Sequence, residues 1–224
     1  VYVSFPSGSS VAVSERDLDA DGTLNVFDTH LSNYSISLSI ERLTCAILDD
    51  ALLYCWGDQS NWIDYQSTPT QVSLPSGRTA ILVGAGFWHT CAILDDGSLH
   101  CWGYNDHGEF GDGTTTSSSS SVQASLPSGR TATSVVAGFH YTCAILDDAS
   151  LYCWGENDEG QLGDGTEIER HTPVQVSLPS GRTAISVSAS THHTCAILDD
   201  GSAYCWGANN YGQLGDGSMT YSST

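Results

Sequence analysis

Short runs of apolar and β-branched residues alternate along the chain with turns rich in glycine, aspartate, serine and proline. Four kinds of run recur, typified by VQVSL, AISVSAS, TCAIL and SLYCWG. Runs of this length and composition are typical of β-strands, and the turn residues between them favour sharp reversals of the chain. The pattern therefore predicts an all-β fold built from units of about four strands.

The last two strands of each unit are predicted to form a hairpin. In the segment TCAILDDGSLHCWG the tight turn is the DDG at residues 95–97, where glycine accepts a positive φ. Pairing about this turn sets Cys91 opposite Cys101 and Ile93 opposite Leu99. One face of the hairpin then carries Cys91, Ile93 and Leu99, and the other carries Ala92, Leu94 and Trp102. Because both faces are apolar, both need cover, which sheets stacked face to face provide.

The hairpin segment recurs four times, at Leu43–Gly57, His89–Gly103, Tyr141–Gly155 and His193–Gly207. The first cysteines of successive hairpins are 46, 52 and 52 residues apart, and a second shared block, SLPSGRTA, stands between them. Self-similarity at a nearly fixed period is the mark of a repeat architecture. We therefore expect one repeat domain over residues 1–224, with repeats at approximately 1–68, 69–120, 121–172 and 173–224.

A glycine-rich tail follows each of the last three hairpins. It reads GYNDHGEFGDGT at Gly103–Thr114, GENDEGQLGDGT at Gly155–Thr166 and GANNYGQLGDGS at Gly207–Ser218. The hairpin with this tail resembles the regulator-of-chromosome-condensation repeat, in a secreted, disulfide-containing, prokaryotic-like version. The resemblance extends over nearly the whole chain and implies a β-propeller of four-stranded blades, usually seven to a ring. The first unit departs from it, because DQSNWIDYQSTP follows Gly57 and the outer loop of that blade must differ.

Four repeats are fewer than the usual seven. The opening VYVSFPSG matches VQVSLPSG, and the closing GDGSMTYSST matches GDGTEIERHT, so one copy's end would run into another's beginning almost in register. A fragment of a longer propeller, a four-bladed ring and a subunit with open ends all remain open. We favour an incomplete or open-ended propeller, because blades of this family are shaped for larger rings. End-to-end contacts between copies would then generate rings or filaments.

The charge of the chain narrows the choice of partners. The net charge is −20, from 26 acidic and 6 basic residues. Such a surface repels nucleic acid and anionic lipid, so no nucleic-acid partner is expected, and it attracts cations or basic partners. Solubility in a salty or divalent-rich medium is an equally good explanation of the charge. No apolar window of about 18 residues exists, so membrane insertion is not expected.

Each hairpin contains a Cys-x9-Cys pair. The hairpin register places the two cysteines directly across two antiparallel strands, at a separation of about 4.5–5.5 Å that suits a disulfide. Free thiols and zinc are the alternatives, but zinc needs four converging ligands and each pair lies in a different unit. Disulfides would imply an extracellular, cell-surface or periplasmic location. The expected disulfides are Cys45–Cys55, Cys91–Cys101, Cys143–Cys153 and Cys195–Cys205.

The first repeat contains an insertion at residues 14–34 that includes DLDADGTLNVFD. Its spacing is that of an EF-hand-type loop, with a glycine at position 6 for the sharp bend and an aspartate at position 12. The terminal aspartate resembles the calcium loops of dockerins and thrombospondin type-3 repeats; a solvated acidic turn is the alternative. We expect one Ca²⁺ site of extracellular type, with a dissociation constant of roughly 10⁻⁴–10⁻³ M. The expected ligands are Asp17, Asp19, Asp21, Thr23, Asn25 and Asp28.

Neither a nucleophile elbow, nor a zinc-protease motif, nor a phosphate-binding loop occurs in the sequence. Residues repeated in every unit serve the scaffold, so differences between units indicate function. On that basis a protein-binding rim is expected from Trp62, Tyr65, Tyr104, Phe110 and Tyr211, and Asn33 begins a glycosylation sequon. We expect a non-enzymatic, secreted or cell-surface interaction or structural module that binds protein, including copies of itself. A propeller lyase or hydrolase with a site on the axis is the alternative.

Overall fold

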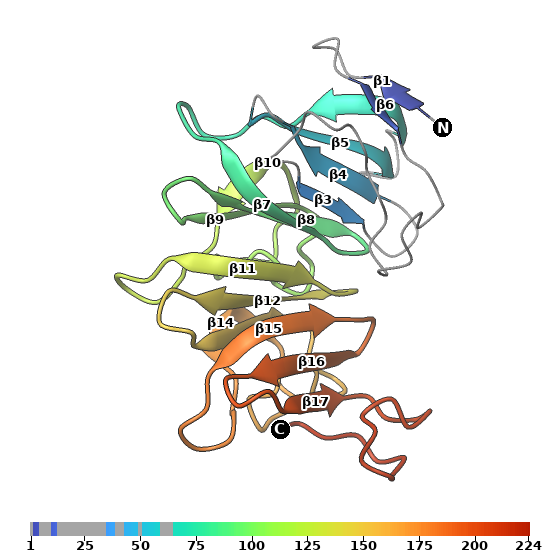
Figure 1. Ribbon diagram of the computed structural model, residues 1–224, viewed down its shortest axis with the longest axis vertical. Helices are drawn as coiled ribbons and strands as arrows, with labels where there is room; N and C mark the ends of the chain where they lie inside the picture. Colours follow the sequence, from blue (N-terminus) through green and yellow to red (C-terminus); the bar gives the residue numbers. More distant parts are fainter. Residues whose placement is uncertain (1, 5–9, 13–34, 39–42, 49–50, 59–64) are drawn as a thin grey trace.

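The structure is a computed structural model that describes residues 2–4, 10–12, 35–38, 43–48, 51–58 and 65–224. In these residues all regular elements are strands, and most of them belong to four antiparallel sheets stacked in one row (Figure 1). We call the sheets blades 1 to 4 in chain order. The predicted all-β propeller-blade fold is thereby confirmed. Over the described ranges there is no helix long and apolar enough to cross a membrane.

Successive strands along the chain are neighbours within each blade. Blade 1 contains β3 (Ser35–Leu38), β4 (Leu43–Ile47), β5 (Leu53–Asp58) and β6 (Tyr65–Gln71). Blade 2 contains β7 (Ala80–Ala85), β8 (His89–Leu94), β9 (Leu99–Gly103) and β10 (Ser118–Gln123). Blade 3 contains β11 (Ala132–Ala137), β12 (Tyr141–Leu146), β13 (Leu151–Gly155) and β14 (Arg170–Gln175). Blade 4 contains β15 (Ala184–Ala189), β16 (His193–Leu198) and β17 (Ala203–Gly207), and a separate pair is formed by β1 (Tyr2–Ser4) and β2 (Ser10–Ala12).

The central hairpin of each blade has the predicted register. In blade 2 Cys91 pairs with Cys101 and Ile93 pairs with Leu99. All eight cysteines form the four predicted disulfides, each between the two central strands of one blade. The two Cα atoms of the Cys91–Cys101 bridge are 4.0 Å apart, closer than the separation of about 4.5–5.5 Å expected from the strand pairing. Each bridge links two residues that are directly paired across its hairpin.

Both faces of the blade 2 hairpin are buried against neighbouring blades. Cys91, Ile93 and Leu99 belong to a core cluster that also contains Ala144 and Trp154 of blade 3. Ala92, Leu94 and Trp102 belong to a cluster that also contains Leu43 and Cys45 of blade 1. The first strands of the blades contact one another along the row, β3 with β7, β7 with β11 and β11 with β15. This is the two-sided cover that the apolar pattern of the hairpin requires.

The outer strand of a blade belongs to a different repeat from the one expected. The expected repeat boundary at residue 173 places the VQVSL run at the start of a unit. In the structure β14 ends at Gln175 and pairs with β13, so this strand closes the blade of the preceding hairpin. The strand β10 closes blade 2 in the same way. The glycine-rich tail returns the chain beside the second hairpin strand, so the outer strand is the next strand in sequence after that hairpin. The remaining VSL residues continue into the connector to the next blade.

The tail loops are organised by a buried asparagine. In blade 2 the Asn105 Oδ1 accepts a hydrogen bond of 2.8 Å from the Phe110 amide, and its Nδ2 donates to the carbonyls of Thr114 and Thr116. The next blade then binds the loop, because the Trp154 Nε1 donates to the Glu109 carbonyl at 2.8 Å. The same bonds recur one blade later around Asn157, Gln161 and Trp206. The repeated asparagine and tryptophan thus hold the scaffold together.

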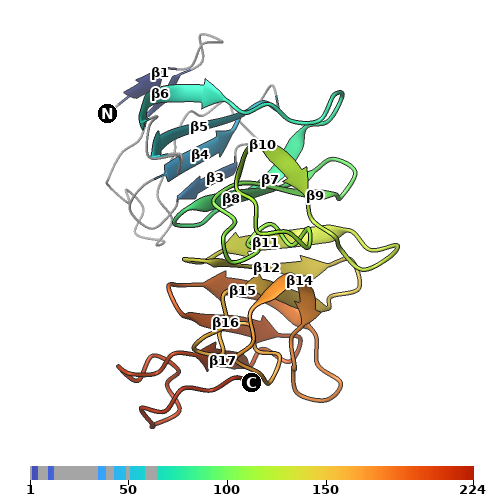
Figure 2. The same ribbon diagram turned by 180° about the vertical axis from the view of Figure 1, so that it is seen from behind.

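Blade 4 lies at one end of the row, and no other sheet of the described residues covers its outer face (Figure 2). Ile197 of β16 is 39% exposed, whereas the equivalent Ile93 and Ile145 are 0% and 5% exposed. Ser222 begins to pair with Gly207 where the other blades have their fourth strand. The uncovered face therefore presents to solvent a residue type that the other blades bury against their neighbours.

Candidate interaction surfaces on the two faces of the row

The strand ends lie on two faces of the row, which differ in chemistry. We call loop face the surface made by residues 86–88, 104–117, 138–140, 156–169 and 190–192, which join β7 to β8, β9 to β10, and so on. We call turn face the opposite surface, made by the hairpin turns at residues 95–98 and 147–150 and the connectors at 124–131 and 176–183. The regular alternation of the strands sends every long tail loop to the loop face.

An aromatic row crosses the loop face from blade to blade. It consists of Trp88, Phe87, Phe139 and His192, all half-buried. The ring centroids of Phe87 and Phe139 are 4.6 Å apart, those of Phe87 and Trp88 4.7 Å, and those of Phe139 and His192 5.9 Å. These distances are those of interacting aromatic pairs. The row thus connects the turns of three successive blades.

A buried carboxylate lies next to this row. Glu109 is fully buried, and its Oε1 is 2.9 Å from the Nδ1 of His140, while its Oε2 accepts a 2.9 Å hydrogen bond from the His107 amide. Blade 3 has Gln161 at the equivalent position, where the Oε1 accepts from the Glu159 amide. A buried carboxyl group without a polar partner would be costly, and the His140 ring supplies such a partner to Glu109.

A second histidine–carboxylate group borders the first. Glu169 accepts from the His171 Nε2 at 2.6 Å and lies 2.8 Å from the His107 Nδ1. Burial favours the neutral acid, but the bonds from His171 and His107 outweigh it and hold the pKa of Glu169 below its usual value. Burial likewise disfavours a charged His107, yet the bond to Glu169 and the charge of Glu109 raise the pKa of His107. The two loops are therefore joined by a histidine–carboxylate contact across the blade 2–blade 3 boundary.

On the turn face each connector arginine binds the acidic turn of the following hairpin. Arg130 lies 3.6 Å from Asp147 and 2.9 Å from Asp148. Arg78 and Arg182 make the same contacts one blade earlier and one blade later. Arg170 pairs with Asp164, so each arginine in the described ranges is within ion-pair distance of an aspartate. The pairs of Arg78, Arg130 and Arg182 are exposed and each adds little stability.

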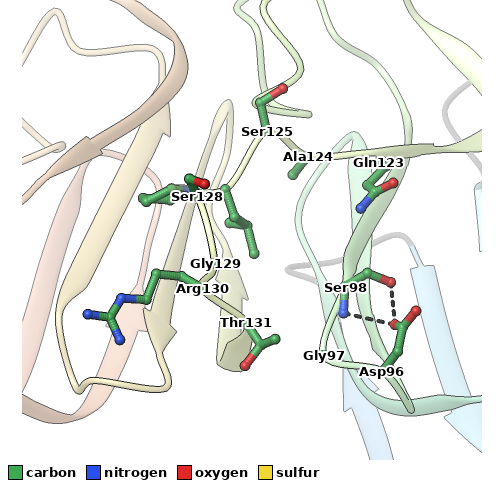
Figure 3. Close-up of a pocket in the computed structure, with 12 residues that line it drawn as sticks. Asp96, Gly97, Ser98, Gln123, Ala124, Ser125, Ser128, Gly129, Arg130 and Thr131 are labelled. Carbon is green, nitrogen blue, oxygen red and sulfur yellow. Dashed lines mark hydrogen bonds between the residues drawn. The ribbon is translucent and has the colours of Figure 1, made fainter.

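A hollow of about 580 Å³ lies on the turn face between the β8–β9 turn and the β10–β11 connector (Figure 3). Ser98, Gln123 and Ser125 line it, and the Arg130 side chain points away from it toward blade 3. The Asp96 Oδ1 accepts from the Ser98 amide at 3.0 Å and from its hydroxyl at 2.6 Å, so this wall is already hydrogen-bonded. A smaller hollow of about 240 Å³ occupies the equivalent place after blade 1. The hollow therefore recurs with the connector between blades.

The structure describes the side chains of three of the five rim residues expected from the sequence. Tyr211 is 91% exposed, and Tyr104 is half-buried with its ring centroid 5.8 Å from that of His140. Phe110 was wrong as a rim residue, because it is fully buried in the cluster of blades 2 and 3. The Asn105 side chain holds the Phe110 amide and turns the loop inward at that point. Tyr65 is the first residue of β6.

Several expected site residues lie outside the described residues. These are Trp62, the glycosylation candidate Asn33, and the calcium ligands Asp17, Asp19, Asp21, Thr23, Asn25 and Asp28. The aromatic row and Glu109, in contrast, were not singled out from the sequence. The signal for both is variation between repeats: GFW and GFH precede β8 and β12 where blade 4 has STH, and Glu109 stands where two other units have glutamine.

Comparison with known proteins identifies the repeat. Profiles described as regulator of chromosome condensation (RCC1) repeat match residues 96–145 and 148–197, and, for a second profile, residues 80–109, 132–161 and 184–213. Combined, the matches of the two profiles extend over residues 80–213, which is more than half of the chain.

Similar proteins share parts of the sequence. The chain is 29% identical over 184 residues to the ultraviolet-B receptor UVR8 of Arabidopsis thaliana, covering 78% of this chain and 41% of the receptor. It is 31% identical over 158 residues to the probable E3 ubiquitin-protein ligase HERC3 of Homo sapiens, covering 70% of this chain and 15% of the ligase. The chain thus spans less than half the length of these relatives.

Solved structures show the same fold. Prp20p of Saccharomyces cerevisiae superposes with a TM-score of 0.68 at 21% identity, covering 78% of this chain and 43% of Prp20p. Human WBSCR16 superposes with a TM-score of 0.74 at 18% identity, covering 89% of this chain and 53% of that protein. At these identities the likeness concerns the fold alone.

Proposed function

Since the chain belongs to the regulator of chromosome condensation (RCC1) repeat family, we propose that it is a non-enzymatic interaction module that binds another protein through its loop face. The observation that carries this proposal is the aromatic row, in which Phe87, Phe139 and His192 connect three blades. Half-buried aromatic side chains in a continuous row are the groups that anchor protein interfaces. The solved structure of Prp20p is described together with its binding to Gsp1p and histones, so this fold carries protein binding in a relative.

The proposed location is outside the cell or at its surface. The support is that every hairpin is closed by a disulfide and that none of the eight cysteines is free. Disulfides persist in oxidising compartments and are rare in the cytosol. Mass spectrometry of the native protein from its source, after alkylation without reduction, tests this. Unmodified disulfide-linked peptides support the proposal, and alkylated cysteines contradict it.

Binding through the loop face is tested by capture with three immobilised forms of the protein. The first is the native chain, the second carries Phe87→Ser and Phe139→Ser on the loop face, and the third carries Gln123→Ala and Ser125→Ala on the turn face. Surface proteins of the source are applied to each. A partner retained by the native and turn-face forms but lost from the loop-face form supports the proposal. A partner lost only from the turn-face form contradicts it.

Self-association is a second candidate function, favoured by the uncovered face of blade 4. Ile197 is 39% exposed there, although its equivalents in blades 2 and 3 are core residues. A second copy that covers this face would extend the row end to end. Sedimentation or mass photometry at micromolar concentration tests this. Ile197→Glu should abolish any oligomer, while Ile81→Glu, at a position 58% exposed in β7, should not.

We keep calcium binding by the insertion at residues 14–34 as a proposal. Its support is the spacing of the carboxylates, the glycine and the terminal aspartate along DLDADGTLNVFD. The site would order the insertion and would add no catalytic step.

A further inference from the structure

We propose that the partner of the loop face is a cationic protein segment, whose arginine or lysine side chains bind between the aromatic row and the carboxylate of Glu156. This inference rests on the proposed function and specifies the chemistry of the partner.

The aromatic row offers ring faces to a cation. Phe87 and Phe139 meet at an interplanar angle of 42°, and Phe139 meets His192 at 56°, so the rings are tilted and do not stack flat against each other. All of them keep part of their surface accessible. A guanidinium or ammonium group within about 6 Å of such a ring face is attracted by the ring quadrupole. An extended segment could engage the rings of blades 2, 3 and 4 in succession.

The backbone brings a carboxylate to the same place. The Glu156 amide donates to the His140 carbonyl at 2.9 Å, and this bond fixes the start of the β13–β14 loop beside the turn that carries Phe139. The Glu156 side chain is 16% exposed, and its Oε2 is 3.7 Å from the His192 Nδ1. Asp158 and Glu159 follow in the same loop. A cation bound at the row would therefore also meet a carboxylate, which strengthens its binding.

Little positive charge of the chain itself competes for this place. The sequence contains no lysine, and the arginines of the described ranges are paired with Asp95, Asp96, Asp147, Asp148, Asp164, Asp199 and Asp200. Glu109 and Glu169 are already paired with histidines, whereas the Glu156 Oε2 accepts a 3.4 Å hydrogen bond from the neutral Gln161 amide and lies 3.7 Å from the His192 Nδ1. With a net charge of −20, the molecule attracts cationic segments and repels acidic ones.

The inference is tested by fluorescence anisotropy with a labelled hexa-arginine peptide and with a hexa-citrulline peptide, which has nearly the same shape but no charge. The arginine peptide should bind in 0.15 M salt and the citrulline peptide should not. Phe139→Leu keeps the apolar bulk and the net charge but removes a ring, and it should weaken binding by about fivefold. Glu156→Gln removes the carboxylate and should weaken binding by a similar factor.

Two matched variants separate this site from diffuse charge attraction. Tyr211→Leu removes an aromatic ring that is 91% exposed in another loop, and Asp112→Asn removes one negative charge within a tight turn of the β9–β10 loop. Both should bind the arginine peptide as the native chain does. The inference is overturned if the peptide fails to bind, or if Phe139→Leu and Glu156→Gln have no more effect than these controls. A partner that requires the loop face but presents a neutral or acidic segment also overturns it, and leaves the proposed function intact.

Discussion

The Nε2 of His89 in blade 2 lies 2.8 Å from the Oγ1 of Thr142 in blade 3. The Thr142 hydroxyl donates to the Glu109 carbonyl at 2.8 Å, so it accepts from His89, and the imidazole proton is on Nε2. The His89 Nδ1 has no hydrogen-bond partner within the described part of the chain. At the equivalent place one blade later, Tyr141 and Thr194 are hydrogen-bonded through their hydroxyls at 3.0 Å.

The buried His89 predicts acid sensitivity. Burial lowers the pKa of His89 from 6.5 to about 4, although the charge of Glu109 opposes this. The unfolded chain therefore takes up this proton more readily than the folded chain between pH 6.5 and 4, and stability should fall as the pH falls through that window. The loss from this residue approaches about 3 kcal/mol at pH 4. Burial lowers the pKa of His100 and His193 as well, with the same sign, whereas the raised pKa of His107 acts in the opposite direction.

The substitution His89→Tyr isolates this effect, because tyrosine occupies the same place in blade 3 and bonds to the next threonine. Urea unfolding at pH 7.5 and pH 4.5 should show a smaller loss of unfolding free energy in the variant than in the native chain. An equal loss in both proteins would mean that His89 is not the source of the acid sensitivity.

Gly97 and Gly129 should respond differently to the same substitution. Both have a positive φ, of 77° and 75°, so alanine is strained at either position by about 1–2 kcal/mol. A Cβ on Gly97 would also lie 2.5 Å from the Thr131 Cβ, whereas a Cβ on Gly129 would meet nothing within 4 Å. Gly97→Ala should therefore lower the unfolding free energy distinctly more than Gly129→Ala. Equal losses in urea titrations would show that Thr131 can move away from the added Cβ without lowering the unfolding free energy.

The four disulfides should differ in their resistance to reduction. Cys195 and Cys205 of blade 4 are half-buried, while the cysteines of blades 1 to 3 are fully buried. Mild dithiothreitol followed by alkylation and peptide mapping should therefore label Cys195 and Cys205 first. Replacing Cys143 and Cys153 together by serine should cost roughly 2.5–3 kcal/mol, the loop-closure figure for a bridge of this span. Simultaneous labelling of all eight cysteines would point to global opening before reduction.

Calcium should stabilise the chain if the predicted loop binds it. Isothermal titration should give binding heat with a dissociation constant of roughly 10⁻⁴–10⁻³ M, and chelation should lower the melting temperature. The variant Asp19→Asn should abolish both effects, while Asp112→Asn, in a tight turn of blade 2, should leave them unchanged. A melting temperature insensitive to chelator, together with no binding heat, would remove the calcium proposal.

The sequence predicts the hairpins well because their determinants are local. The DDG turn, the alternation of residues and the apolar character of both faces lead to the pairing of Cys91 with Cys101 and to cover on both sides. Glycine is not obligatory at this place, because in the equivalent turn of blade 3 Ala149 adopts a positive φ of 63°.

The loops could not be predicted in the same way. Whether an aromatic residue such as Phe110 faces inward depends on the hydrogen bond that its amide donates to the Asn105 Oδ1. Asn105 lies five residues earlier, in a glycine-rich segment without regular periodicity. The aromatic row exists only because turns 52 residues apart in the chain meet across blades, as Phe87 meets Phe139. Contacts of this kind depend on how the blades stack, so the sequence of a single unit gives little indication of them.

The indole bonds between blades have one direction, because each loop supplies a carbonyl and the following blade supplies the indole that donates to it. Removal of residues 132–183, one period of 52, would bring the Trp206 indole to the Glu109 carbonyl in place of Trp154. Duplication of a period would insert a blade with two matching surfaces. In evolution, such a gene can therefore gain or lose whole blades by recombination between repeats, and the number of blades becomes a heritable variable that selection can adjust without redesigning any contact.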